Sequence, residues 1–188
     1  LGIARQTDKG VELRVHPTLV PKNCLIAGVD DVLNAVMVNA DAVGTTLFYG
    51  PGAGAAPTAS SVVADIIDVA RVMNNDPQSW VPALGVPTNA VAAQNIVDIQ
   101  EIETSFYMRF SALDQPGVLS TVTGIMANAG ISIEAISQKE QPATEEYVDV
   151  IILTNITHEK SLDAAVKYIE QLETVRGQVS FIRVEHLD

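Results

Sequence analysis

The stretch from residue 104 onward constrains the fold most, because its apolar residues switch repeatedly between two periods. Strand-like alternation in Phe106, Met108 and Phe110 is followed by helical spacing, and both patterns then return. The spacing predicts strands at 104–110, 131–139, 147–154 and 179–184, and helices at 118–129 and 157–172. The order β-α-β-β-α-β is the split βαβ arrangement of ferredoxin-like folds.

Turn residues mark the ends of these elements. Asp114-Gln115-Pro116-Gly117 predicts a turn into the first helix, Gly130 suits a helix C-terminus, and residues 140–145 form a charged loop. Thr157 is predicted to cap the second helix. With Asp114-x-Pro116-Gly117-Val118-Leu119 and Asn128-Ala129-Gly130-Ile131, the stretch resembles an ACT domain. ACT domains sense small molecules, commonly amino acids, and commonly pair side by side.

The first part of the chain is organised around a glycine-rich turn. Strands are expected at 11–15, 32–40 and 45–49, the last two as a hairpin, and a helix follows at 59–73. Gly50, Gly52 and Gly54 remove the Cβ atoms between strand and helix.

Pro57 suits the first turn of that helix, and Thr58 or Ser60 is expected to cap free amides there. One interpretation is a tight strand-to-helix connection. The other is a site where an anion or a polar cofactor edge meets bare backbone. The pattern is neither a dinucleotide fingerprint nor a P-loop.

Three motifs connect this region to a known family. Asn34-Ala35-Val36, Phe48 to Gly54 and Pro57 to Ile66 resemble the end of the catalytic domain of homoserine dehydrogenase, over residues 2–73. The resemblance implies an α/β (α+β) chain: the end of a mixed-sheet substrate domain, followed by the ferredoxin-like ACT domain. The predicted division is 1–75 for the substrate-domain part, 76–103 for a linker and 104–188 for the ACT domain.

The same resemblance implies an oxidoreductase. The family interconverts L-aspartate 4-semialdehyde and L-homoserine with NADP or NAD, on the route to threonine, methionine and isoleucine. The cofactor is held by an N-terminal Rossmann domain whose glycine fingerprint is missing here, as is the motif of the catalytic lysine. Catalytic residues are therefore expected upstream of this chain. A first residue that is not methionine also indicates a piece of a longer protein, inactive alone.

The resemblance also implies two binding sites. The family's glycine turn closes over the nicotinamide end of the cofactor, so Gly54, Gly52 and Thr58 are predicted to bind it. In the ACT domain, the amides beyond Gly117 would hold an amino-acid carboxylate, and Asn128 its amino group, from the same chain or a neighbouring one. The predicted effector-binding residues are Asp114, Gly117, Val118, Asn128 and Ile131. Threonine, as an end product, is the candidate effector; alternatively Asp114 to Gly117 is only a turn and the ACT domain only oligomerises.

Composition and net charge argue against several other kinds of partner and site. A formal net charge of −12 argues against nucleic acid and against an anionic membrane surface as partners. The single cysteine, Cys24, allows neither an intramolecular disulfide nor a cysteine metal site, which fits a reducing cytoplasm. His16, His158 and His186 lie far apart in sequence, so no metal site is expected.

Three hypotheses remain. The chain is part of a homoserine dehydrogenase, a stand-alone amino-acid-binding ACT module, or a structural dimerisation unit. A homodimer or tetramer through ACT domains is expected. The choice between NAD and NADP depends on residues outside this sequence.

Overall fold

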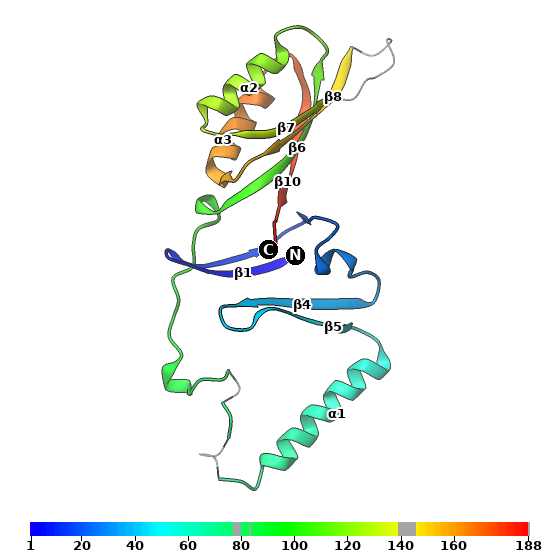
Figure 1. The fold of residues 1–188 in the computed structure, drawn as a ribbon, viewed down its shortest axis with the longest axis vertical. Coiled ribbons are helices and arrows are strands. Elements are labelled where there is room, and N and C mark those ends of the chain that lie inside the picture. Colours follow the sequence, from blue (N-terminus) through cyan, green and yellow to red (C-terminus); the bar gives the residue numbers. More distant parts are fainter. Residues whose placement is uncertain (77–79, 83, 139–145, 188) are drawn as a thin grey trace. The chain divides into compact units, whose positions relative to one another are not determined.

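The structure is a computed structural model that describes residues 1–76, 80–82, 84–138 and 146–187 (Figure 1). The predicted charged loop at 140–145 lies outside the described residues. Two compact units are present: residues 1–20 together with 94–188, and residues 21–93. The division at 75 and 103 stays a prediction about domains, whereas the compact units group residues 1–20 with the C-terminal part of the chain.

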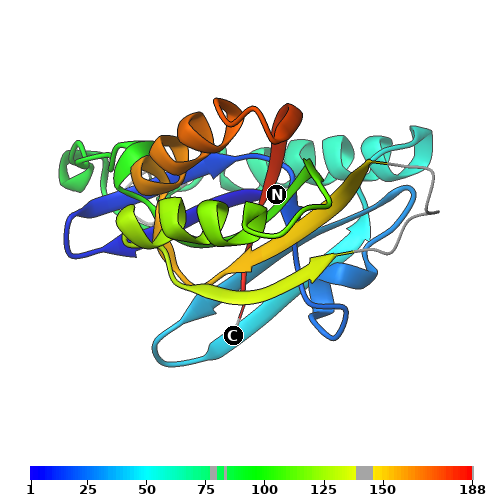
Figure 2. The ribbon, with the colours of Figure 1, turned by 90° about the horizontal axis from the view of Figure 1, so that it is seen from above.

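The predicted β-α-β-β-α-β order from residue 104 is confirmed. Each neighbouring pair of its strands is antiparallel, in the order β10-β6-β8-β7. The elements are β6 (Glu103–Leu113), α2 (Val118–Asn128), β7 (Ile133–Gln138), β8 (Tyr147–Thr154), α3 (Glu159–Glu170) and β10 (Val175–Val184). Helices α2 and α3 lie side by side over the sheet (Figure 2).

The hydrophobic core of this unit lies between the sheet and the two helices. Alternate residues of a strand share one face, so Phe106 and Met108 of β6 and Ile152 of β8 are buried together. The helices contribute Val122, Met126, Leu162 and Ile169. The buried backbone N–H of Phe106 donates to the Thr154 Oγ1 atom at 2.9 Å, which satisfies a polar group inside the core.

Residues 1–20 extend this unit. β1 (Gly2–Thr7), which the sequence did not predict, pairs antiparallel with the predicted strand β2 (Gly10–Val15). The two-residue strand β3 (Thr18–Leu19) then pairs parallel with β10, so the sheet order becomes β3-β10-β6-β8-β7. The backbone N–H of Glu185, just after β10, donates to Leu19 O at 2.9 Å and extends this pairing.

The connections contain short elements. The stretch predicted as a linker, 76–103, contains the 3₁₀ turn η4 (Ile99–Glu101), whose N-terminus is capped by Asp98. β9 (Thr157–His158) pairs with β6. Thr157 is not the helix cap that the sequence predicts: His158 occupies the N-cap position of α3 and makes no side-chain capping bond. The other 3₁₀ turns are η1 (Leu25–Gly28) and η3 (Thr88–Ala90).

The unit formed by residues 21–93 contains the predicted hairpin and helix. β4 (Leu33–Ala40) and β5 (Gly44–Pro51) are antiparallel, and α1 (Ala55–Val72) follows the glycine turn. Helix α1 has no buried residue, and Val62 and Ile66 on its apolar positions are more than half exposed. An amphipathic helix with an exposed apolar face needs another surface to cover it.

Candidate functional site

The glycine turn joins β5 directly to α1. Gly54 is the N-cap residue of α1, with a φ of 119°, a conformation that side chains other than glycine rarely adopt. Contrary to the sequence prediction, neither Thr58 nor Ser60 caps the helix: its N-terminus has no side-chain capping bond. Thr58 lies inside the first turn and its backbone N–H donates to Gly54 O at 3.1 Å. This helix end therefore faces outward with bare backbone.

Gly52 is required for a different reason. Its backbone N–H donates to Val32 O at 3.0 Å, which closes the end of the hairpin. A Cβ atom on Gly52 would lie 1.9 Å from the Asn34 side-chain nitrogen. The turn therefore places Gly52 against Asn34 and leaves Gly54 exposed, so the two glycines predicted for cofactor binding have different surroundings.

The predicted effector residues of the ACT domain are divided between two places. Asp114, Gly117 and Val118 line a cavity of about 170 Å³ at the N-terminal end of α2. Its floor is apolar, and it is closed on one side by Gln138 of β7, whose Nε2 atom donates to the Asp114 carboxylate at 3.1 Å. Gly117 is the N-cap residue, at a φ of 94° and without a side-chain cap. The cavity thus offers one carboxylate and a helix N-terminus without a side-chain cap, whose first amide, Val118 N–H, donates to Gln115 O at 3.4 Å.

Asn128 and Ile131 lie at the other end of α2. Ten residues of helix, at about 1.5 Å each, place Asn128 roughly 15 Å from Val118. Ile131 is buried in the core, and its backbone N–H donates to Met126 O at 2.9 Å. One ACT domain therefore does not bring all five predicted effector residues together, and Asn128 can reach such a cavity only on a second copy.

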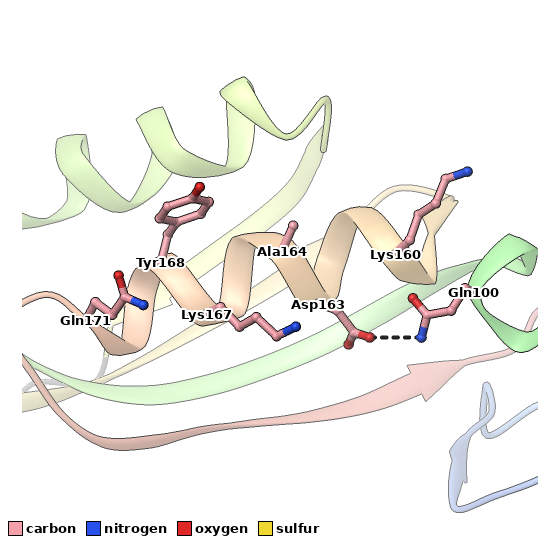
Figure 3. Close-up of a pocket in the computed structure, with 7 residues that line it drawn as sticks. All are labelled: Gln100, Lys160, Asp163, Ala164, Lys167, Tyr168 and Gln171. Atoms are coloured by element: carbon pink, nitrogen blue, oxygen red, sulfur yellow. Dashed lines mark hydrogen bonds between the residues drawn. The ribbon is translucent and has the colours of Figure 1, made fainter.

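A larger hollow of about 520 Å³ lies along the outer side of α3 (Figure 3). It is lined by exposed polar side chains, among them Lys160, Asp163 and Lys167. Asp163 accepts a hydrogen bond from Gln100 at 3.1 Å, and Lys160 pairs with Glu101 at 2.7 Å and lowers its pKa by this hydrogen bond and its charge. Asp163 and Lys160 are thus paired with residues of η4, and no sequence motif points to the hollow.

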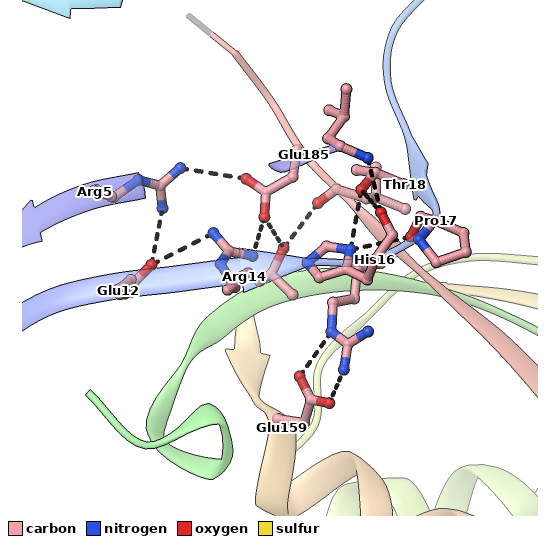
Figure 4. A network of polar contacts seen from close by, with 12 residues as sticks. Arg5, Glu12, Arg14, His16, Pro17, Thr18, Glu159 and Glu185 are labelled. Carbon is pink, nitrogen blue, oxygen red and sulfur yellow. Dashed lines mark hydrogen bonds and ion pairs between the residues drawn. The ribbon is translucent and has the colours of Figure 1, made fainter. Parts of the chain in front are cut away.

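A buried charged cluster, which the sequence analysis missed, joins β2 to the end of β10 (Figure 4). It consists of Glu12 and Arg14 of β2, Arg5 of β1, and Glu185. The Arg14 guanidinium forms an ion pair with Glu185 and a second with Glu12 at 3.4 Å, and Arg5 reaches Glu185 at 3.2 Å. The side chain of Arg14 is 0% exposed and that of Glu185 is 4% exposed. Two arginines and two carboxylates make the cluster formally neutral, although the Arg5 side chain is 45% exposed.

The orientation of β2 explains why the cluster escaped prediction. Alternation in Val11 to Val15 predicts a strand, but it does not say which face is inward. In the structure the polar residues Glu12 and Arg14 face the rest of the unit, while Val15 is 89% exposed. A glutamate and an arginine two residues apart on one strand are a weak signal for a buried ion pair.

His16 lies next to this cluster and provides a test of it. Burial lowers the pKa of His16, and the neighbouring Arg183 and Arg14 charges act in the same direction, against the Pro17 hydrogen bond. Because the folded state then binds fewer protons than the unfolded state below about pH 6.5, stability falls as the pH falls. We expect the melting temperature of wild type to drop more between about pH 7.5 and 5.5 than that of His16→Gln. Equal drops in thermal melts of the two proteins would contradict this assignment.

The described residues contain neither a candidate metal site nor a membrane-spanning helix. In the parts of the chain that the structure describes, no three histidine, cysteine, aspartate or glutamate side chains gather as a metal site would require. Among the described helices, none combines the length and apolarity needed to cross a membrane. Cys24 is a free, partly buried thiol.

Comparison with known proteins agrees with the two resemblances in the sequence. Residues 1–67 match the family model of homoserine dehydrogenase, and residues 106–174 match that of the ACT domain. The chain is 50% identical over 188 residues to a homoserine dehydrogenase of Pseudomonas aeruginosa, and 48% identical over 187 residues to one of Neisseria gonorrhoeae. Each match covers 100% of this chain and 43% of the relative.

A solved structure extends the comparison to the fold. A homoserine dehydrogenase from Thiobacillus denitrificans matches with a TM-score of 0.90 and 48% identity, over 100% of this chain and 42% of that one. This chain thus spans less than half the length of the relatives that it matches. The chain belongs to the homoserine dehydrogenase family, with residues 1–67 in the region that defines the family and an ACT domain after them.

Proposed function

We propose that this chain is part of an enzyme that interconverts L-aspartate 4-semialdehyde and L-homoserine with NADP or NAD. The observation that carries the proposal is the 50% identity to a homoserine dehydrogenase along all 188 residues. The glycine turn lies within the matched region, at the start of α1. A cytoplasmic location fits the family's place in amino-acid biosynthesis and the single cysteine.

The glycine turn fits the nicotinamide end of the cofactor. Exposed Gly54 and the uncapped start of α1 provide backbone amides that a planar ring or its carboxamide can approach closely. Gly52 holds the turn against Asn34, and Thr58 adds a hydroxyl on the same first turn. The cofactor supplies hydride transfer when bound, while these residues orient it. The groups that move the proton belong to the part of the enzyme outside this sequence.

The exposed apolar face of α1 supports a role inside a larger protein. Val62, Val63 and Ile66 are each more than half exposed, as are Val36 and Phe48 of the hairpin. Exposed apolar residues on a helix face and on a hairpin are typical of surfaces that another part of a protein covers. The remaining part of the enzyme, which the relatives contain and this chain does not, is the proposed cover.

The direct test is an assay of the full-length protein. Aspartate semialdehyde is supplied with NADPH or NADH, and the loss of reduced cofactor is followed by absorbance. We expect turnover with at least one cofactor, and none with the 188-residue chain alone. A full-length protein without turnover, but with amino-acid binding, would instead indicate an ACT sensor module.

The ACT domain is proposed to bind an amino-acid effector, with threonine as the first candidate. The uncapped amides beyond Gly117 suit the effector's carboxylate, and Asp114, held by Gln138, suits its ammonium group. Val118 provides an apolar wall. Asn128 and the backbone of Ile131 would complete the site from a second copy.

Replacing Asp114 with asparagine tests this site. We expect threonine to bind the full-length enzyme at least about tenfold more weakly in Asp114→Asn, because the charge partner of the ammonium group is lost. Asp149→Asn is the matched control, since Asp149 pairs with Arg109 away from the cavity. Calorimetry measures both constants. If the wild-type protein releases no heat with millimolar threonine, the ACT domain does not bind threonine and its role is structural.

Pairing of two ACT domains is proposed through β7. Among the described strands, β7 pairs only with β8, so its outer edge presents unpaired backbone groups. At the opposite edge of the four-stranded sheet, β3 pairs with Arg183 and Val184 at the end of β10. Sedimentation equilibrium of the full-length protein is expected to give a dimer or tetramer, and an Ile136→Pro change in β7 should lower its association constant.

A further inference from the structure

The feature that the proposed function leaves unexplained is the buried charged cluster of Arg5, Glu12, Arg14 and Glu185. Burying charged groups such as Glu12, Arg14 and Glu185 is costly unless each is paired. Here Arg14 pairs with Glu185 across 171 residues of sequence, and the half-exposed Arg5 pairs with Glu185 across 180. Arg14 and Glu12 belong to β2, within the matched homoserine dehydrogenase region. Glu185 directly follows β10, the last strand of the ACT sheet.

Hydrogen bonds reinforce the same contact. β3 pairs parallel with the end of β10, at Thr18 with Arg183 and Leu19 with Val184. Thr104 of β6 donates to Val184 O at 2.8 Å and also contacts the Glu185 carboxylate at 3.3 Å. The Glu185 carboxylate is therefore held from β1, β2 and β6 at once, which leaves it little freedom to move independently.

A second ion pair fixes the same end of β10 to the helical layer. Arg183 pairs with Glu159, the first residue of α3, with its Nε atom 2.8 Å from a carboxylate oxygen. Glu159 is 4% exposed. A displacement of the C-terminal end of β10 would thus displace both α3 and β2.

The other end of β10 lies beside the candidate effector cavity. Val175 pairs with Ala112, a residue that lines the cavity, and the N–H of Leu113 donates to Thr174 O at 2.9 Å. Nine steps of about 3.3 Å each carry β10 roughly 30 Å from Val175 to Val184 and on to the buried cluster, with an irregularity in its pairing with β6 between Arg176 and Ser180. A single strand, bulged near its start, therefore connects the cavity with residues 1–20.

We propose that the Arg14–Glu185 pair is the joint that transmits effector binding from the ACT domain to the catalytic region. This inference rests on the proposed function for its effector, but not for the joint itself. Arg14 and Glu185 are positioning residues: they touch neither cofactor nor effector, and they keep β2 and β3 moving with β10. Contact along a strand does not by itself demonstrate coupling, so the test must measure it.

The test uses Glu185→Gln, which keeps the shape of the side chain and removes its charge. In the full-length enzyme we expect the dissociation constant for threonine to change by less than about twofold, while maximal inhibition at saturating threonine falls at least about fivefold. If Glu185 contributed only to general stability, the variant would not lose inhibition while keeping its affinity for threonine. Asp149→Asn is the matched control, because the Arg109–Asp149 pair joins β6 to β8 only, and it should leave both unchanged.

Hydrogen exchange on the same proteins tests the joint without an effector. We expect amides of β2 and β3 to exchange at least about tenfold faster in Glu185→Gln than in wild type, with those of β8 unchanged. Unchanged exchange in β2 and β3, or full inhibition by threonine in the variant, would overturn the proposal. If wild type is insensitive to every amino acid, the proposed regulation fails, and the exchange result still decides whether the joint exists.

Discussion

Replacing Arg14 with methionine is expected to destabilise the unit formed by residues 1–20 and 94–188 by roughly 3–5 kcal/mol. The methionine fills a similar volume, so lost packing contributes little. The cost arises because the carboxylates of Glu185 and Glu12, both almost fully buried, lose their main partner. Urea unfolding followed by circular dichroism measures the change in the free energy of unfolding.

The double variant Arg14→Met/Glu185→Leu separates pairing from packing. When both charges are removed, the cost of desolvating them disappears together with their attraction. We therefore expect the double variant to recover most of the stability that Arg14→Met loses. Arg109→Met is the surface control: its guanidinium is 56% exposed beside Asp149, so its loss should cost less than about 1 kcal/mol. A cost below about 1 kcal/mol for Arg14→Met would show that the cluster is not an important stabilising contact.

Replacing Gly54 with valine is expected to raise the KM for the nicotinamide cofactor about 10- to 100-fold in the full-length enzyme, equivalent to about 1.4–2.8 kcal/mol of binding. Gly54 has a φ of 119°, which valine adopts only with strain, and the added side chain would stand where bare backbone is proposed to meet the cofactor. Gly54 is exposed and α1 has no buried residue, so the strain should remain local. Steady-state kinetics with varied cofactor gives the constant.

Gly44→Val is the control for backbone strain. Gly44 also has a positive φ, of 72°, but it lies at the start of β5, at the far end of the hairpin strand from the glycine turn. We expect this variant to lose stability without a change in cofactor KM. An unchanged KM in Gly54→Val, or the same increase in both variants, would contradict the cofactor role of the turn.

Much of the ACT domain could be predicted because its signals are local. Period-two and helical spacing in residues 104–184, with glycine at 117 and 130, specify each element from its own residues. The hairpin of β4 and β5 and the glycine turn before α1 are equally local. The helix caps were harder: Thr58 and Thr157 have suitable side chains, yet Gly54 and His158 occupy the N-cap positions.

The long-range features could not be predicted in the same way. β1 contains few large apolar residues, and it is held by pairing with β2 rather than by a pattern of its own. The effector residues show the same limit: Asp114 and Asn128 come from two motifs predicted to bind one ligand, but they lie at opposite ends of α2.

The amino-acid sequence alone was enough for the family, for the order of elements in the ACT domain and for the position of the glycine turn, because each follows from residues close together in the chain. The partners of Glu12, Arg14 and Glu185 emerged only from the folded structure. Alternation with a period of two residues indicates which residues of a strand share a face, but it does not indicate which face is buried. That choice depends on what β10 brings against β2, and this contact joins segments about 170 residues apart.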